Sequence, residues 1–246
     1  MKNLLLILLC LPSFTSFGQV LDYDGNDDGC VNIDDALGLL MEFGQCLDVE
    51  VFVCGETIEH QDYDYSTVQI GEQCWFAENC RYLPSVSPSS EGSETDPYYY
   101  VYDYQGFVVP AAQATDNYAT YGVLYNWPAV MTEGICPSGW HIPSDEEFTE
   151  LTDFLGGESA AGGAMKEAGY DHWISPNTWA TNSSGWTGLP GGYRSYGFLN
   201  VGLVGSWWSA SESGSYSWGR ILSNSYDLVR DDYVRDLGFS ARCVRD

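Results

Sequence analysis

The distribution of cysteines constrains the fold of this chain more than any other feature of its sequence. The chain has 8 cysteines in 246 residues, and one of them, Cys10, lies inside an N-terminal apolar run. The cysteines that follow this run are Cys30, Cys46, Cys54, Cys74, Cys80, Cys136 and Cys243. Exported chains with this many cysteines use disulfides, whereas reducing compartments keep thiols free. We therefore expect a fold tied by covalent cross-links.

The first 18 residues have the pattern of a secretory signal peptide. Lys2 supplies the positive charge, the apolar core runs over 4–11, and cleavage is expected between Gly18 and Gln19. The apolar run is too short to span a bilayer permanently, so we expect no integral membrane segment in the mature chain. These features predict a secreted or cell-surface protein. A lipid anchor on Cys10 is the alternative interpretation.

Cysteine spacing suggests pairings but does not determine them. The pairs that suit the sequence are Cys30 with Cys46, Cys54 with Cys74, and Cys136 with Cys243. Cys80 is then left over, either as a free thiol or exchanged with Cys74. No C-x-x-C pair is present and the three histidines are isolated from one another, so the pattern does not indicate a zinc site.

Oxygen-bearing side chains recur between residues 24 and 35 at the spacing of an EF-hand calcium loop. Gly29 stands at position 6, where the loop turns sharply, and position 12 is an Asp in place of the usual Glu. The expected calcium ligands are Asp24, Asn26, Asp28, the backbone carbonyl of Cys30, Asn32 and Asp35. The loop resembles one repeat of a dockerin, a module that usually has two. We expect a dockerin-like calcium-binding module over 19–48, with Ca²⁺ as its cofactor.

The charge balance limits the partners of the chain. There are 35 acidic and 9 basic residues, and the formal net charge is −26. A chain this acidic repels nucleic acid and anionic membranes, so we expect no nucleic-acid partner. A cation-rich exterior and simple solubility explain the charge equally well.

The remaining segment, 49–246, has the pattern of one α+β domain with two helices among short antiparallel strands. Ser144 and Glu147 form a capping box at the start of a helix that ends at Gly156-Gly157. A second, weaker helix is expected over 160–168, and a loop over 84–97. The expected strands are 65–70, 73–76, 98–104, 120–127, 206–210, 217–223, 227–230 and 239–244.

Six motifs occur in order along this domain. They are G-E-Q-C-W-F-A-E-N at 71–79, Y-G-V-L-Y-N-W at 121–127, C-P-S-G-W-H-I-P-S at 136–144, G-L-P-G-G-Y-R at 188–194, W-W-S-A-S at 207–211 and G-F-S-A-R-C-V-R at 238–245. Together they resemble the Fibrobacter succinogenes major paralogous domain of exported bacterial proteins, over about residues 54–246. Cys80 departs from this family, which usually has Leu there, and this is consistent with an unpaired thiol.

The resemblance implies a C-type lectin-like fold, related to that of sulfatase-modifying factors. In that fold two helices flank a small twisted sheet, and a long-range disulfide joins the middle of the domain to its C-terminus, which suits Cys136 with Cys243. The family has no settled biochemical activity, and a fold alone does not imply a function.

The sequence does not favour catalysis. It lacks a G-x-S-x-G elbow and an H-x-x-x-H ligand set. His141 is interpreted as a packed, hydrogen-bonded core residue, and Glu146 and Glu147 as capping residues. We therefore expect that the protein is not an enzyme. The alternative is an enzyme related to sulfatase-modifying factors.

The expected function is binding of a protein or a glycan by an exported, non-catalytic protein. The standard lectin calcium motifs are absent, because the segment 175–177 reads S-P-N and no W-N-D is present. The candidate ligand-binding residues are Tyr193, Arg194, Trp207, Trp208 and Trp218, with Tyr196 and Tyr216 nearby. For Trp207 and Trp208 the alternative, which the alternation along a strand favours, is core packing with one ring in the core and one half covered. Arg220 and Arg242 are expected to pair with carboxylates. A structural cell-surface scaffold or adhesin component is the alternative function.

Overall fold

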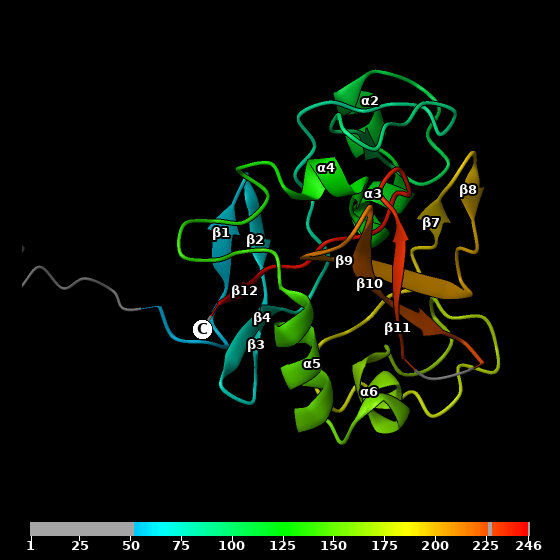
Figure 1. The fold of residues 1–246 in the computed structure, drawn as a ribbon. Helices are drawn as coiled ribbons and strands as arrows, with labels where there is room; N and C mark the ends of the chain where they lie inside the picture. The colour runs from blue at the N-terminus through cyan, green and yellow to red at the C-terminus, as the bar shows by residue number, and fades with distance from the viewer. Residues whose placement is uncertain (1–51, 226–227, 246) are drawn as a thin grey trace, which may run out of the picture. The chain divides into compact units, whose positions relative to one another are not determined.

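A computed structural model describes residues 52–225 and 228–245 of the chain (Figure 1). The expected signal peptide, the expected dockerin-like module and the expected Cys30–Cys46 pair lie outside these residues. The same is true of the expected calcium ligands Asp24, Asn26, Asp28, Cys30, Asn32 and Asp35. Within the described ranges, no helix has the length and apolar character needed to cross a membrane.

The described unit contains helices and small antiparallel sheets, as expected for an α+β domain. Its strands are β1 (Ile58–His60), β2 (Tyr63–Tyr65), β3 (Thr67–Ile70), β4 (Gln73–Phe76), β5 (Tyr99–Tyr100), β6 (Leu124–Tyr125), β7 (Tyr193–Arg194), β8 (Phe198–Leu199), β9 (Val204–Ser213), β10 (Tyr216–Ser223), β11 (Val229–Val234) and β12 (Val244–Arg245). Its helices are α2 (Val109–Gln113), α3 (Asp116–Tyr121), α4 (Trp127–Val130), α5 (Asp145–Phe154) and α6 (Glu158–Met165).

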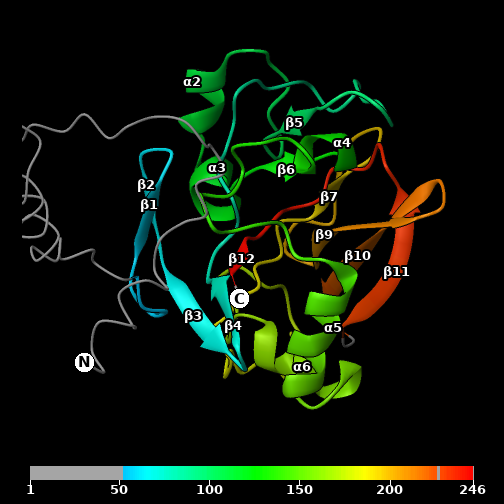
Figure 2. The same cartoon turned by 60° about the vertical axis from the view of Figure 1, so that its left-hand side comes forward.

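Two three-stranded sheets organise the unit. One has the order β11-β10-β9, and the other has the order β12-β4-β3. Strand β12 pairs with β4, so the end of the chain returns to the first strands of the domain. Helices α5 and α6 lie together at one end of the unit, and α2 and α4 lie towards the other end (Figures 1 and 2).

Helix α5 confirms the strongest local prediction. The Ser144 side chain accepts a hydrogen bond from the Glu147 backbone N–H, and the Glu147 carboxylate accepts one from the Ser144 N–H, so both halves of the capping box are present. Helix α6 starts at Glu158 and ends at Met165, earlier than expected at both ends. It ends there because Lys166 is extended and pairs with Gly188.

Three of the expected strands are shorter than predicted. Segments 98–104, 120–127 and 239–244 contain only β5, β6 and the first residue of β12 in strand pairs. Part of the second segment belongs to α3, which Thr115 caps by accepting a hydrogen bond from the Tyr118 N–H. Asn126 caps α4 in the same way. These helices are too short to give a hydrophobic period, so only their caps could have indicated them.

The core consists of two clusters of buried side chains. On two of the strands, adjacent residues belong to different clusters. On β4, Trp75 packs in one cluster and Phe76 in the other. On β9, Trp207 lies with Trp75, and Trp208 lies with Phe76. Successive side chains of a strand point to opposite faces, so both strands are buried on two sides.

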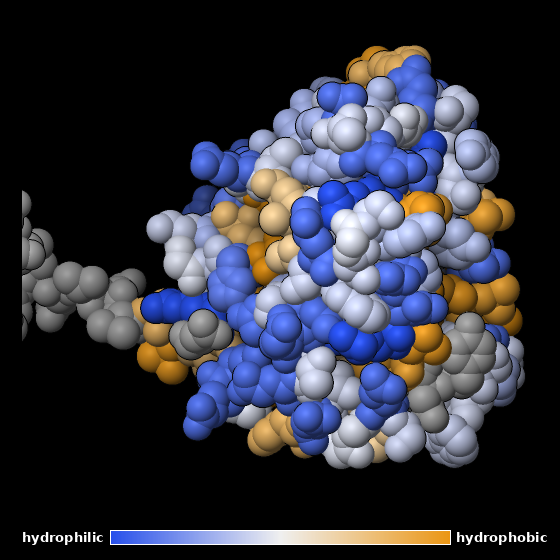
Figure 3. All heavy atoms as spheres, in the orientation of Figure 1, coloured by the Kyte–Doolittle hydropathy of each residue, from blue (hydrophilic) through white to orange (hydrophobic). Residues whose placement is uncertain are grey.

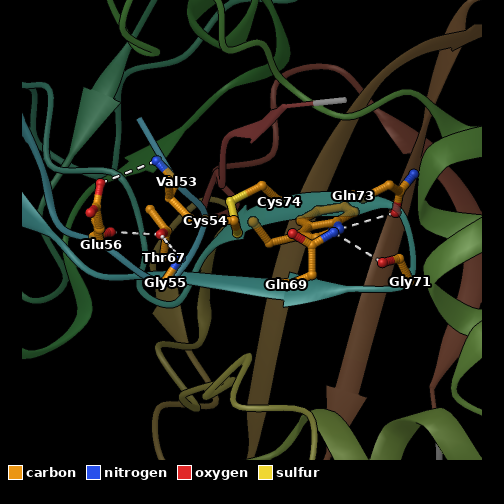
Figure 4. Close-up of a disulfide and its surroundings, with 10 residues drawn as sticks. Val53, Cys54, Gly55, Glu56, Thr67, Gln69, Gly71, Gln73 and Cys74 are labelled. Carbon is orange, nitrogen blue, oxygen red and sulfur yellow. Dashed lines mark hydrogen bonds between the residues drawn. A yellow bond between two sulfur atoms is a disulfide. The ribbon is translucent and has the colours of Figure 1, made fainter. Parts of the chain in front are cut away.

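The structure confirms two of the disulfides. Cys54 is bonded to Cys74, which attaches the start of the unit to β4 beside β3 (Figure 4). Cys136 is bonded to Cys243 across 107 residues of sequence. Cys80 is a buried free thiol. The exchange of Cys80 with Cys74 is therefore not observed.

A buried ion cluster fastens α5 to the β9–β10–β11 sheet. Arg220 Nη1 lies 2.7 Å from Asp145 Oδ1, and the Arg220 side chain is only 1% exposed. Arg230 Nη2 lies 2.5 Å from Asp145 Oδ2. Burial acts to raise the pKa of Asp145, but the hydrogen bonds and charges of the two arginines outweigh it and lower the pKa.

Replacing Asp145 with Asn should destabilise the domain by about 3 kcal/mol or more, because it leaves the buried Arg220 charge without its carboxylate counter-charge. Urea unfolding at neutral pH measures this change. The matched control is Glu146→Gln, an exposed acid in the same first turn, which should cost at most about 1 kcal/mol. Equal effects of the two variants would show that the cluster adds nothing to stability.

The stability that Asp145 supplies should also depend on pH. Its pKa is lower in the folded chain, so its contribution is complete above about pH 4 and is lost as the pH falls through the folded pKa. The difference in unfolding free energy between the native protein and Asp145→Asn should therefore shrink in acid. A difference that stays constant from pH 7 to pH 2 would contradict this.

Candidate functional site

The two tryptophans expected at a ligand-binding surface are in the core. Trp207 and Trp208 are both 0% exposed. The Trp207 indole N–H donates to Asn79 Oδ1 at 2.8 Å, and the Trp208 indole N–H donates to the Tyr125 carbonyl at 2.8 Å. Neither ring can stack on a ligand, so the prediction of surface contact is wrong and the alternative of core packing is correct.

Arg194 is also structural. It is 1% exposed, and its Nε donates to the Ser89 carbonyl at 2.9 Å. Its Nη2 donates to the Glu91 carbonyl at 2.7 Å, and its Nη1 donates to the Asp236 carbonyl at 2.5 Å. Since these bonds fasten one loop to another, Arg194 is not available to a ligand. Its predicted ligand role is wrong.

Two further arginines were expected to pair with carboxylates, and they differ. Arg220 does so through Asp145. Arg242 is 0% exposed and makes no ion pair with any carboxylate in 52–225 or 228–245. It donates instead to neutral oxygens, including Asn79 Oδ1 at 3.1 Å and the Thr187 carbonyl at 2.8 Å. The prediction for Arg242 is therefore wrong.

Trp218 and His141 lie nearer the surface. The Trp218 ring is half-buried, and the Arg230 guanidinium covers it at 3.8 Å from the ring centroid. His141 is exposed, with Nε2 2.5 Å from Glu147 Oε1. The interpretation of His141 as a core residue is therefore wrong, although the hydrogen bond that was expected of it is present. The helix cap holds Glu147 in this pair, so the contact belongs to the start of α5.

Tyr193 is the predicted ligand residue that faces a cavity. The cavity has a volume of about 410 Å³. Its lining residues come from the β7–β8 hairpin, the β9–β10–β11 sheet and the segment after it: Tyr193, Ser195, Asn200, Val204, Ile221, Tyr233, Leu237 and Phe239. Cavities of about 300–1,000 Å³ are the size of small-molecule sites.

The core supports the aromatic side of this cavity. Tyr193 meets Phe239 edge to face with ring centroids 6.3 Å apart, and Tyr233 meets the same ring at 5.1 Å. Behind them, Trp208 stacks on Phe239 at 4.4 Å. Trp208 therefore supports the cavity wall from behind and is not itself part of the lining. The W-W-S-A-S motif at 207–211 therefore lies close to the cavity, but the Trp208 side chain points into the core.

Three polar groups at the cavity are available for hydrogen bonds to a bound molecule. Over the part of the chain that the structure describes, the Tyr193 hydroxyl, the Ser195 hydroxyl and the Asn200 side-chain amide have no hydrogen-bond partner. Ser195 and Asn200 belong to the connections on either side of β8, and Asn200 has a positive φ of 61° that asparagine tolerates. In the sequence, the only sign of these groups is that Ser195 and Asn200 follow Tyr193 closely in the chain.

The described surface has a second cavity of about 410 Å³, lined mainly by apolar side chains. On the face drawn in Figure 3, hydrophilic residues predominate and hydrophobic residues form small separate groups. Across residues 52–225 and 228–245, no three His, Cys, Asp or Glu side chains gather in a group that could hold a metal ion.

A model of the Fibrobacter succinogenes major domain family matches residues 68–245. The match covers the cavity, both three-stranded sheets and α2 to α6. Neither a curated protein nor a solved structure matches the chain.

If Trp207 is a core residue, Trp207→Ala should destabilise the domain by about 3–5 kcal/mol, because it leaves a large cavity and removes one of the two hydrogen bonds that Asn79 Oδ1 accepts. The matched control is Trp179→Ala, since Trp179 is 70% exposed and its loss should change stability by at most about 0.5 kcal/mol. Denaturant unfolding measures both. A Trp207→Ala protein as stable as the control would mean that the ring is not packed as described.

Proposed function

The chain belongs to the Fibrobacter succinogenes major domain family, and from that premise we propose that it is an exported, non-catalytic protein that binds a glycan in the Tyr193 cavity. The observation that carries the proposal is the lining of the cavity. It combines aromatic rings with a hydroxyl, a phenol and an amide that have no internal hydrogen bonds among the described residues.

This combination matches the chemistry of a sugar. A pyranose ring has apolar C–H faces that pack on aromatic rings, and hydroxyls that both donate and accept hydrogen bonds. The Asn200 amide and the Ser195 hydroxyl can do the same from the cavity side. The rigid core behind Phe239 fixes the aromatic wall in advance, which lowers the ordering cost of binding.

The absence of charge in the lining narrows the class of ligand. None of the eight lining residues is acidic or basic. An anionic sugar or a phosphate would bury a charge there without a partner, at a high cost in free energy. We therefore propose a neutral saccharide of one or two rings, bound at the end of a chain or as a branch.

The finer assignments from the sequence support this proposal as hypotheses. The C-type lectin-like fold agrees with the mixture of helices and antiparallel strands and with the Cys136–Cys243 bond. In the proposal, Ca²⁺ binds only the N-terminal loop, through ligands such as Asp24 and Asp35. Glycan binding should therefore persist in a chelator.

A glycan array and a set of cell-wall polysaccharides, screened with the whole mature chain, test the proposal. Tyr193→Ala should weaken the binding of a hit at least about tenfold, equivalent to ~1.4 kcal/mol, in isothermal titration. The control is Tyr196→Ala, three residues along the same hairpin, where the ring is 88% exposed and outside the cavity lining. It should bind like the native protein.

Two outcomes would overturn the proposal. One is a blank screen with folded protein, which would favour a protein ligand or a scaffold role. The other is a hit that Tyr193→Ala binds as tightly as the native protein does, which would place the site elsewhere. Thermal unfolding of both variants separates a lost contact from a lost fold.

A further inference from the structure

A buried thiol lies against the long-range disulfide. The Cys80 sulfur is 3.5 Å from the Cys243 sulfur, and both residues are 0% exposed. Cys243 is at the same time bonded to Cys136. Sulfur atoms in a disulfide are ~2.0 Å apart, so side-chain motion of an ångström or two would bring Cys80 into bonding distance.

We propose that Cys80 is an internal nucleophile for the Cys136–Cys243 disulfide, so that the domain has two covalent states. In one state the disulfide joins Cys136 to Cys243 and the thiol is Cys80, in the core. In the other the disulfide joins Cys80 to Cys243 and the thiol is Cys136. Cys136 in the second state is a modification site for thiol-reactive small molecules.

The exchange is balanced within the chain. The Cys80 thiolate attacks the Cys243 sulfur, the Cys80–Cys243 bond forms, and the Cys136–Cys243 bond breaks. Cys136 leaves as a thiolate and takes up the proton that Cys80 released. One disulfide and one thiol are present before and after, so the step needs no oxidant or reductant.

The backbone around the sulfurs is held while they exchange. The Cys80 N–H donates to the Ala241 carbonyl at 2.9 Å, and the Phe76 N–H donates to the Cys243 carbonyl at 3.0 Å. The segments that carry Cys80 and Cys243 are therefore bonded to each other whichever disulfide is present. The exchange frees only the segment that carries Cys136.

Cys136 differs from the other two cysteines because it reaches the surface. It is partly exposed and lines a second cavity of about 410 Å³. The apolar members of that lining are Val130, Met131, Ile135, Trp140, Ile142 and Ala210. A Cys136 thiol there could react with a low-molecular-weight disulfide, forming a mixed disulfide and releasing one equivalent of thiol.

Burial keeps the exchange slow at neutral pH. It raises the pKa of the Cys80 thiol to about 12, although the Arg242 charge acts to lower it. The titratable and charged groups that act on Cys80 or on its partner Arg242 are Tyr65, Glu78, Arg81, Tyr125 and Arg242. Burial raises the pKa values of both tyrosines, so these phenols stay neutral while Cys80 begins to ionise. The exchange rate should therefore rise about tenfold per pH unit.

Alkylation of the whole native chain with N-ethylmaleimide at pH 7 and pH 9, followed by disulfide mapping of its peptides, tests the proposal. At pH 9, label should accumulate on Cys136 while Cys80 becomes linked to Cys243, with a rate about a hundredfold that at pH 7. Cys80→Ala is the matched control and should give no label on Cys136. Circular dichroism checks that both proteins stay folded at pH 9.

Three results would overturn the proposal: no label on Cys136 at pH 9, label on Cys136 at the same rate in Cys80→Ala, or label on Cys80 alone. A second variant tests the alternative bond directly. Cys136→Ser, refolded in a glutathione redox buffer, should contain the Cys80–Cys243 disulfide. Free Cys80 and Cys243 thiols in that folded variant would also count against the proposal.

Discussion

The guanidinium of Arg242 is buried in the core. It donates hydrogen bonds to neutral oxygens on several segments, and these segments supply residues to both core clusters. It stacks over Trp186 at 3.7 Å and donates to Asn79 Oδ1, which also accepts the Trp207 indole N–H. The remaining acceptors are the carbonyls of Phe76, Trp186 and Thr187. Burial lowers the pKa of Arg242 to about 9, so the side chain remains largely charged at neutral pH. Several carbonyl dipoles and an aromatic face replace a counter-ion.

This arrangement explains why so aromatic a chain leaves few rings for a ligand. Strands β4 and β9 are buried on both faces, so adjacent rings such as Trp207 and Trp208 enter different clusters. The residues of the proposed binding cavity are then at the edge of the core, where Tyr193 of the β7–β8 hairpin packs against Phe239. Trp208 stacks on Phe239 in the wall of this cavity, so the proposed binding site depends on the packing of the core.

Local and covalent features could be predicted from the sequence, whereas burial could not. The capping box at Ser144 needed only neighbouring residues. Cysteine spacing suggested the two disulfides, and the family resemblance supported the bond between Cys136 and Cys243. The sequence favoured core packing for each tryptophan, but full burial of both Trp207 and Trp208 could not be predicted, because one sequence does not show whether a strand is covered on one face or two. The burial of Arg194 could not be predicted either. The surroundings of Arg242 could not be predicted for a related reason. The many carboxylates of the chain favour an ion pair, whereas the packing surrounds this guanidinium with neutral oxygens.

The adjacent tryptophans on β9 build the core, and in our proposal binding is left to the Tyr193 cavity. Hydrogen exchange of the indole N–H groups, followed by NMR, tests the first half most directly, with the 70% exposed Trp179 as the internal reference. The account predicts that the Trp207 and Trp208 indole protons exchange as slowly as the most protected amides of β4 and β9. Exchange of either proton as fast as that of Trp179 would contradict it.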